Sequence, residues 1–224
     1  MKVTEHLSRA EGKTLFSFEV LPPRKGENIQ TLFANIEPLL EFKPPFIDVT
    51  YHREEYVYRQ HPNGLLEKKT VRRRPGTVGI CAAIKNRFDV DTVPHLICGG
   101  FTREETENAL IDLHFLGIDN VLALRGDPIR SEGRFVAEPD GHAYACDLIG
   151  QVSDLNKGEY LDEAQDDTSA TDFCIGTAGY PEKHFESPNS GADLRYLKHK
   201  VDRGAEYIVT QMFFDNEQFF AFER

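Results

Sequence analysis

Short apolar stretches recur along the chain, and each ends in polar or aromatic residues. In the clearest of them, at residues 120–128, four apolar residues run directly into Arg125, Gly126 and Asp127. An apolar run of this length followed by charged residues predicts a buried strand that ends abruptly. Five other stretches share the pattern. The six expected strands lie at residues 16–19, 46–51, 92–98, 120–124, 173–179 and 207–210.

Patterns with helical spacing separate these strands. Residues 28–42 repeat apolar side chains at intervals of three and four, which predicts an amphipathic helix. Thr102 and Glu105 form a capping box before the next helix, and Gly117 is suited to end it. Further helices are expected at residues 1–12, 78–88, 142–155 and 192–203 and from residue 215 onward. Strand followed by helix throughout predicts a parallel sheet of the α/β class.

A doubly wound sheet and a (β/α)8 barrel of the TIM type both fit this alternation. Gly76, Gly79, Gly99 and Gly100 do not form a G-x-G-x-x-G stretch, so the doubly wound alternative loses its main support. A barrel gathers its chemistry at the carboxyl ends of its strands, where the unusual residues of this chain lie. We therefore expect a TIM-type barrel with about six βα units present, and the two remaining units beyond Arg224.

The whole chain, residues 1–224, is predicted to be a single barrel domain that is incomplete at its C-terminal end. Two segments interrupt the frame. Residues 53–75 resemble a hairpin with an Asn-Gly tip, and their run of three arginines is expected to be a solvated loop face. Residues 156–172 are acidic and poor in apolar residues. We expect them to form an exposed loop on the face away from the site.

Composition narrows the classes of function. Hydrophobic residues make up 40% of 224, which supports a real core. The net charge of −11 argues against nucleic acid or an anionic membrane as the main partner. Four scattered cysteines without a C-x-x-C pair indicate reduced thiols in a cytoplasmic protein. We read no signal peptide and no apolar run long enough for a membrane helix.

Glu19 is the first candidate for chemistry, because it ends a strand and stands among phenylalanine, valine and leucine residues. A carboxyl group in such an apolar setting is expected to hold its proton near neutrality and to donate it. The alternative is a salt-bridged glutamate inside the barrel.

Arg125 and Asp127 form a second candidate pair. They are two positions apart, so they point to one side if the strand geometry continues, and Gly126 lets a ligand approach the backbone. The arginine could hold a phosphate or a carboxylate, and the aspartate could face a ring nitrogen. A simple ion pair at a strand end is the alternative.

His95, Cys98 and Gln211 are weaker candidates when taken alone. A metal site from His95 and Cys98 needs two more ligands, and no residues have a convincing spacing, so we predict no metal and a packed or hydrogen-bonding histidine. Gln211 follows an apolar strand and could form hydrogen bonds with an amide or a heterocycle.

Eight short motifs occur in order from about residue 12 to the end. They are SFE at 17–19, VTY at 49–51, PHL at 94–96, ALRGD at 123–127, YA at 144–145, YPE at 180–182, KVD at 200–202 and TQ at 210–211. Together they closely resemble the 5,10-methylenetetrahydrofolate reductases, a family of flavin-dependent barrels of one-carbon metabolism.

The resemblance implies an oxidoreductase that reduces 5,10-methylenetetrahydrofolate to 5-methyltetrahydrofolate and so supplies methyl groups for methionine synthesis. It implies FAD as cofactor, NADH or NADPH as co-substrate and a ping-pong hydride transfer. The expected partners are the folate substrate, the nicotinamide nucleotide and further copies of the chain in a homo-oligomer. Two alternatives stay open, a flavin-free pterin-binding barrel of the methyltransferase type and an inactive truncated barrel.

The resemblance also assigns roles to residues. Glu19 would be the general acid that helps to open the five-membered ring of the folate. Asp127 would lie by the pterin and the flavin ring, and Gln211 would contact nicotinamide and pterin in turn. Thr50 would lie near the nicotinamide. The FAD contacts would come from Tyr51, His95, Arg125, Gly126, Asp127, Tyr144, Ala145, Tyr180, His184, Asp193, Tyr196 and Lys200.

Overall fold

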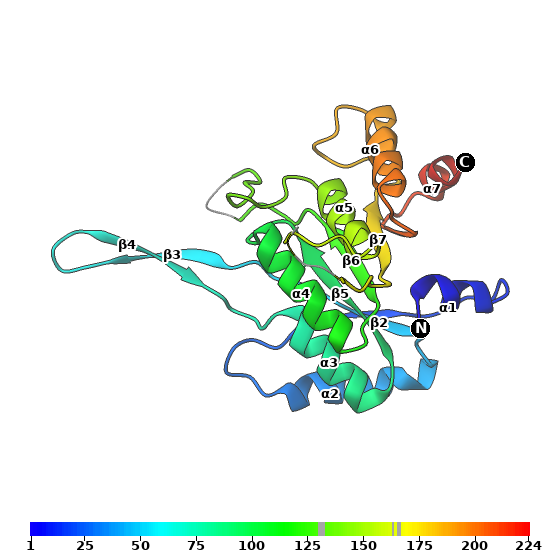
Figure 1. The fold of residues 1–224 in the computed structure, drawn as a ribbon, viewed down its shortest axis with the longest axis horizontal. Helices are drawn as coiled ribbons and strands as arrows, with labels where there is room; N and C mark the ends of the chain where they lie inside the picture. The colour runs from blue at the N-terminus through cyan, green and yellow to red at the C-terminus, as the bar shows by residue number, and fades with distance from the viewer. Residues whose placement is uncertain (130–132, 163, 165–166) are drawn as a thin grey trace.

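Six parallel strands form one curved sheet, which is part of a TIM-type barrel (Figure 1). The computed structural model describes residues 1–129, 133–162, 164 and 167–224. The strands are β1 (Phe18–Val20), β2 (Phe46–Val49), β5 (Asp91–Ile97), β6 (Asn120–Leu124), β7 (Cys174–Gly179) and β8 (Tyr207–Thr210). They lie in this same order across the sheet, with β1 and β8 at its edges. The predicted α/β barrel architecture is therefore confirmed.

Helices follow the strands and cover the outer face of the sheet (Figure 1). They are α2 (Ile29–Ile36), the 3₁₀ helix η1 (Glu37–Phe42), α3 (Thr77–Phe88), α4 (Arg103–Phe115), α5 (Ala145–Leu155), α6 (Ser190–Asp202) and α7 (Asn216–Glu223). The main core lies between these helices and the strands, where Ile47, Leu110 and Ile149 are fully buried. The predicted capping box of α4 is present, since Thr102 and Glu105 bond each other's backbone N–H groups.

Several predicted boundaries were wrong, among them the following three. The first strand runs from residue 18 to 20, and Phe16 is exposed outside it. The helix expected over residues 28–42 is α-helical only to Ile36, because Pro38 has no N–H group and its ring disfavours a continuous α-helix, so a 3₁₀ turn follows. The helix expected from residue 142 begins at Ala145.

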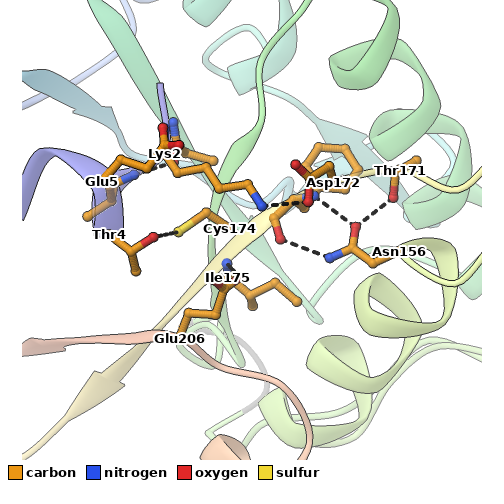
Figure 2. A network of polar contacts seen from close by, with 12 residues as sticks. Lys2, Thr4, Glu5, Asn156, Thr171, Asp172, Cys174, Ile175 and Glu206 are labelled. Carbon is orange, nitrogen blue, oxygen red and sulfur yellow. Dashed lines mark hydrogen bonds and ion pairs between the residues drawn. The ribbon is translucent and has the colours of Figure 1, made fainter. Parts of the chain in front are cut away.

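The N-terminal helix α1 (Val3–Arg9) lies at the end of the sheet where β5 and β6 begin, because the Val3 N–H donates to Asn120 and His6 lies 2.9 Å from Asp91. Val3 is buried against Val93, Leu122 and Cys174, which point into the barrel. Figure 2 shows the polar contacts of the first residues of the chain, among which the ammonium group of Lys2 lies 2.5 Å from the carboxylate of Asp172. These contacts join the first residues of the chain to β7.

Residues 156–172 lead into β7 at this same end of the sheet. The side chain of Asn156 donates to the carbonyl of Phe173 and accepts from the backbone N–H of Phe173 and from Thr171, as Figure 2 shows. Positions 163, 165 and 166 of the predicted acidic loop lie outside the described residues.

A two-stranded antiparallel hairpin, β3 (Glu55–Gln60) and β4 (Leu66–Val71), leaves the sheet after β2 and projects away from the barrel (Figure 1). Among the described residues, no helix is long and apolar enough to cross a membrane.

Candidate functional site

Three polar side chains meet inside the barrel near the carboxyl ends of its first strands. Glu19 on β1 is directly opposite Asp48 on β2. The Nε2 atom of His95 lies 3.7 Å from a carboxylate oxygen of each. The His95 and Asp48 side chains are only 8% and 14% exposed, whereas that of Glu19 is 61% exposed. This gives a buried imidazole between two carboxylates, one of which faces solvent.

The exposure of Glu19 corrects one expectation. The apolar neighbours in the sequence predicted a desolvated carboxyl group that keeps its proton near neutrality. Glu19 instead lies on the edge strand β1, and the side chains of a strand alternate between its two faces. Phe18 turns to the other side and packs its ring against Phe42, so it does not bury Glu19. In this structure the carboxylate of Glu19 therefore lies beside the imidazole of His95 and not in an apolar pocket.

The next site element follows β6, where the strand geometry does not continue. The strand ends at Leu124, and Gly126 has a φ of +83°, in the left-handed region that favours glycine. Arg125 and Asp127 therefore do not follow the alternation of an extended strand. A Cβ atom at position 126 would also lie 3.2 Å from the side chain of Ile97. Both its φ and its close packing favour glycine here.

Arg125 turns toward the loop after β7. Its Nη1 atom donates to Glu186 at 2.5 Å, and its guanidinium lies 5.0 Å from the ring centre of Phe135. The hydrogen bond with Glu186 is the main cause of the raised pKa of Arg125. The alternative of a simple Arg125–Asp127 ion pair is therefore not observed, since the hydrogen-bonded partner is Glu186.

A second group of predicted residues gathers between β7 and α6. The rings of Tyr180 and His184 meet edge to face, with centroids 4.7 Å apart. Asp193 accepts from the backbone N–H of His184 at 3.1 Å and from Ser187 at 2.6 Å. Lys200, two turns further along α6, donates to the carbonyl of Ala178.

Burial shifts the pKa of three side chains of this second group, those of Lys200, His184 and Tyr180. It lowers the pKa of Lys200 and of His184, and Arg125 adds to the effect on His184. Burial also raises the pKa of Tyr180, with Asp127 and Asp193 contributing through their charge. A neutral imidazole, a neutral phenol and a partly desolvated ammonium group are suited to hydrogen bonding with a polar, anionic ligand.

Tyr51 and Thr50 lie beyond β2. Thr50 donates twice to the carbonyl of Val20, through its backbone N–H and its hydroxyl. The ring of Tyr51 packs edge to face on Phe101, and burial raises its pKa. Next to Tyr51 lies a cavity of about 340 Å³, which Arg72 also lines.

The remaining predicted residues do not join these groups. Tyr144 precedes α5 and Tyr196 lies on α6, and both side chains are exposed. Ala145 is the first residue of α5. Gln211 follows β8 and is exposed, and its backbone N–H donates to Gly179.

Sequence reasoning missed Asp48 and Glu186. Asp48 stands between Ile47 and Val49, which are both fully buried in the main core. Strand alternation turns its carboxylate to the interior of the barrel, so the same period of two could have found it. Glu186 lies in a loop, and no sequence pattern connects it with Arg125.

The side chains fit a large polar cofactor that carries phosphates. The Nε2 atom of His95 is a buried polar atom without a hydrogen-bond partner among the described residues. Buried polar atoms of folded proteins are nearly always paired, so this atom points to a missing ligand. Arg125 and Lys200 supply the positive charge that phosphates require.

Solved structures support the barrel fold. A protein from Clostridium thermocellum, described as binding two copies of 5-methyl-5,6,7,8-tetrahydrofolic acid, matches 99% of this chain and 62% of its own with a TM-score of 0.51 and 12% identity. A 2,3-dimethylmalate lyase of the PEP mutase/isocitrate lyase superfamily matches 97% of this chain and 65% of its own with a TM-score of 0.55 and 10% identity. At such identities the likeness concerns the fold alone.

Sequence relatives show the family. The family model for methylenetetrahydrofolate reductase matches residues 2–224. The chain is 34% identical to methylenetetrahydrofolate reductase (NADH) 1 of Arabidopsis thaliana and 33% identical to 5,10-methylenetetrahydrofolate reductase of Salmonella typhimurium. These alignments cover 99% and 98% of this chain, but only 34% and 62% of the relatives. The chain belongs to the methylenetetrahydrofolate reductase family.

Proposed function

We propose that this chain catalyses the reduction of 5,10-methylenetetrahydrofolate to 5-methyltetrahydrofolate, with NADH or NADPH as the source of the hydride. FAD, when bound, would carry the hydride from the nicotinamide to the folate in a ping-pong sequence. The product would supply methyl groups for methionine synthesis in the cytoplasm. The observation that carries the proposal is the buried, unpartnered His95 beside Glu19 in a chain of this family.

Glu19 would act as the general acid of the folate half-reaction. Its exposed carboxyl group can reach a substrate, and His95 lies close enough to exchange a proton with it after a small rearrangement. Asp48 would hold the imidazole from the other side. Glu19 and His95 would thus deliver together the proton that opens the folate ring. Glu19 would not have to be buried for this role.

The cofactor would be held by the residues after β6 and β7. Arg125 and Lys200 would bind its phosphates, and His184 and Tyr180 would offer neutral hydrogen-bonding groups beside them. Gly126, Tyr51, Tyr144, Ala145, Asp193 and Tyr196 complete the proposed set. Asp127 is exposed and would face both the flavin ring and the folate. Thr50 and Gln211 would flank the nicotinamide and, after its departure, the pterin.

The flavin spectrum of the purified protein tests this proposal. We expect a yellow protein after FAD addition, loss of the absorbance with NADH or NADPH under anaerobic conditions, and its return on addition of 5,10-methylenetetrahydrofolate. A folded protein that binds the folate but neither FAD nor a nicotinamide would instead support a barrel of the methyltransferase type. A folded protein that binds neither ligand would support the inactive alternative.

A further inference from the structure

The hairpin of β3 and β4 lacks the support that such an element needs. We call residues 53–75 the arm. Its two strands have six residues each, pair with one another in a separate sheet and project from the barrel (Figure 1). Isolated two-stranded hairpins are marginally stable in water at best. The arm is therefore expected to be covered by something other than the described part of its own chain.

One face of the arm is aromatic, aliphatic and basic. The register places Tyr58 opposite Lys68 and Gln60 opposite Leu66, and Tyr56 lies on the same face two positions before Tyr58. Tyr58 is 56% exposed and Leu66 is 66% exposed. The ammonium group of Lys68 lies 3.4 Å from the centre of the Tyr56 ring. Exposed tyrosines are typical of protein interfaces, where this residue type is enriched.

Charge separates the arm from the rest of the chain. Its 23 residues contain seven Lys or Arg and three Asp or Glu, which gives the arm a net charge of +4. The net charge of the whole chain is −11, so the residues outside the arm have a net charge of −15. Arg73 pairs with Glu55 within the arm, whereas Lys68 and Lys69 form no ion pair with any described residue. A basic projection on an acidic body is complementary to the body of another copy.

The acidic body offers a matching hollow. A cavity of about 880 Å³ lies between α4, α5 and the loop before β7. Its acidic lining consists of Glu107, Asp140, Asp147, Asp154, Glu159 and Asp162. Arg103 and Arg203 also line it, which leaves the lining with a net negative charge. We call this cavity the acidic hollow.

We propose that the arm docks on the acidic hollow of a second copy of this chain, with Lys68 facing its carboxylates and with Tyr58 and Leu66 on the same face covered by the contact. In the proposed dimer the docking is reciprocal, so the arm of each copy occupies the hollow of the other and the assembly is closed. The interface does not involve the proposed catalytic groups, so it holds whether or not the chain is a reductase.

Sedimentation velocity measurements with charge-reversed variants test the dimer. Wild type should sediment with twice the 25.5 kDa mass of the chain at low salt and should dissociate near 1 M salt, where the Debye length is about 3 Å. Lys68→Glu/Lys69→Glu and Glu159→Lys/Asp162→Lys should each be monomeric, because arm and hollow then have like charges. An equimolar mixture of the two variants should restore dimers, since both contacts of the mixed pair are complementary.

The control is Lys13→Glu/Lys43→Glu, which makes the same change in net charge at exposed positions outside the arm. It should remain dimeric, and circular dichroism should show that all variants are folded. A monomeric wild type at low salt, a dimer that survives reversal of Lys68 and Lys69, or a mixture that stays monomeric would each overturn the proposal.

Discussion

The Nε2 atom of His95 lies 3.7 Å from a carboxylate oxygen of Asp48, in the interior of the barrel. Neither this distance nor the 3.7 Å to Glu19 is a hydrogen bond, so the imidazole is held between two acceptors without a close contact to either. Such an arrangement can tighten around a substrate, as catalytic hydrogen bonds often do. It suggests that Asp48 positions His95 for proton exchange with Glu19.

Asp48→Asn tests this positioning role. The change keeps the shape but removes the negative charge that lies 3.7 Å from the imidazole. We expect the folate half-reaction to slow by about 10- to 100-fold, a modest part of the usual contribution of acid–base catalysis. Reduction of the flavin by the nicotinamide should change little, and stopped-flow absorbance measures the two steps separately. Asp112→Asn, at an exposed position of α4, is the control, and equal rates in the two variants would contradict the role.

Glu19→Gln removes the proposed acid. The variant should keep FAD and the nicotinamide half-reaction, while folate reduction should fall by about 10²- to 10⁴-fold, the usual range for a general acid. Anaerobic single-turnover experiments with each substrate give the two rates. Equal losses in both half-reactions would show that Glu19 supports binding or folding and does not act as an acid.

Asp127→Asn tests the exposed carboxylate after β6. The loss of its charge should slow folate turnover and alter flavin reduction, because the proposed position faces both ligands. It should also lower the pKa of Tyr180 relative to wild type, since Asp127 contributes to raising that pKa. Half-reaction kinetics together with an ultraviolet titration, with Tyr180→Phe to assign the signal, measure both effects. Wild-type behaviour in every measurement would remove Asp127 from the site.

Gly126→Ala should destabilise the fold. An alanine at a φ of +83° is strained by about 1–2 kcal/mol, and its Cβ would crowd Ile97. Urea unfolding measures the change. Gly79→Ala is the matched control, because Gly79 lies in α3 with nothing within 4 Å of the added Cβ, and it should stabilise the helix by about 0.5–1 kcal/mol. A neutral Gly126→Ala would mean that the loop relaxes without cost.

Asp91→Asn should weaken the attachment of the N-terminal helix α1 to the barrel and so lower the free energy of unfolding. The Asp91 side chain is 16% exposed and lies 2.9 Å from His6 of α1 and 3.0 Å from Lys85. Burial alone would raise the pKa of Asp91, but hydrogen bonds from the terminal amino group, His6 and Lys85 outweigh it, and the pKa lies below 3.8. The substitution should cost about 1–3 kcal/mol at neutral pH.

The pH dependence of this effect has a definite sign. Because folding lowers the pKa of Asp91, its contribution is complete above the unfolded value of 3.8 and is lost as the pH falls through the folded value. The difference in unfolding free energy between wild type and Asp91→Asn should therefore be constant near neutrality and shrink in acid. Asp89→Asn, exposed and in the left-handed region, should show no such difference. A gap that persists in strong acid would contradict the assignment.

The sequence by itself determined the frame of this protein. Strand and helix periodicities placed six strands in their correct order, because a buried parallel strand needs an unbroken apolar run and a covering helix needs one apolar face. The motifs at the strand ends also indicated the family, and the family model over residues 2–224 confirms it. Local rules suffice for such features, since each depends on neighbours in the chain.

Only the tertiary structure decided how the site residues meet. Whether Glu19 is buried depends on which strands lie beside β1, and the partner of Arg125 is Glu186, 61 residues away. Asp48 belongs to the candidate site only because the pairing of β2 with β5 places it beside His95. Such contacts join distant parts of the chain through the curvature of the sheet, so no local pattern encodes them.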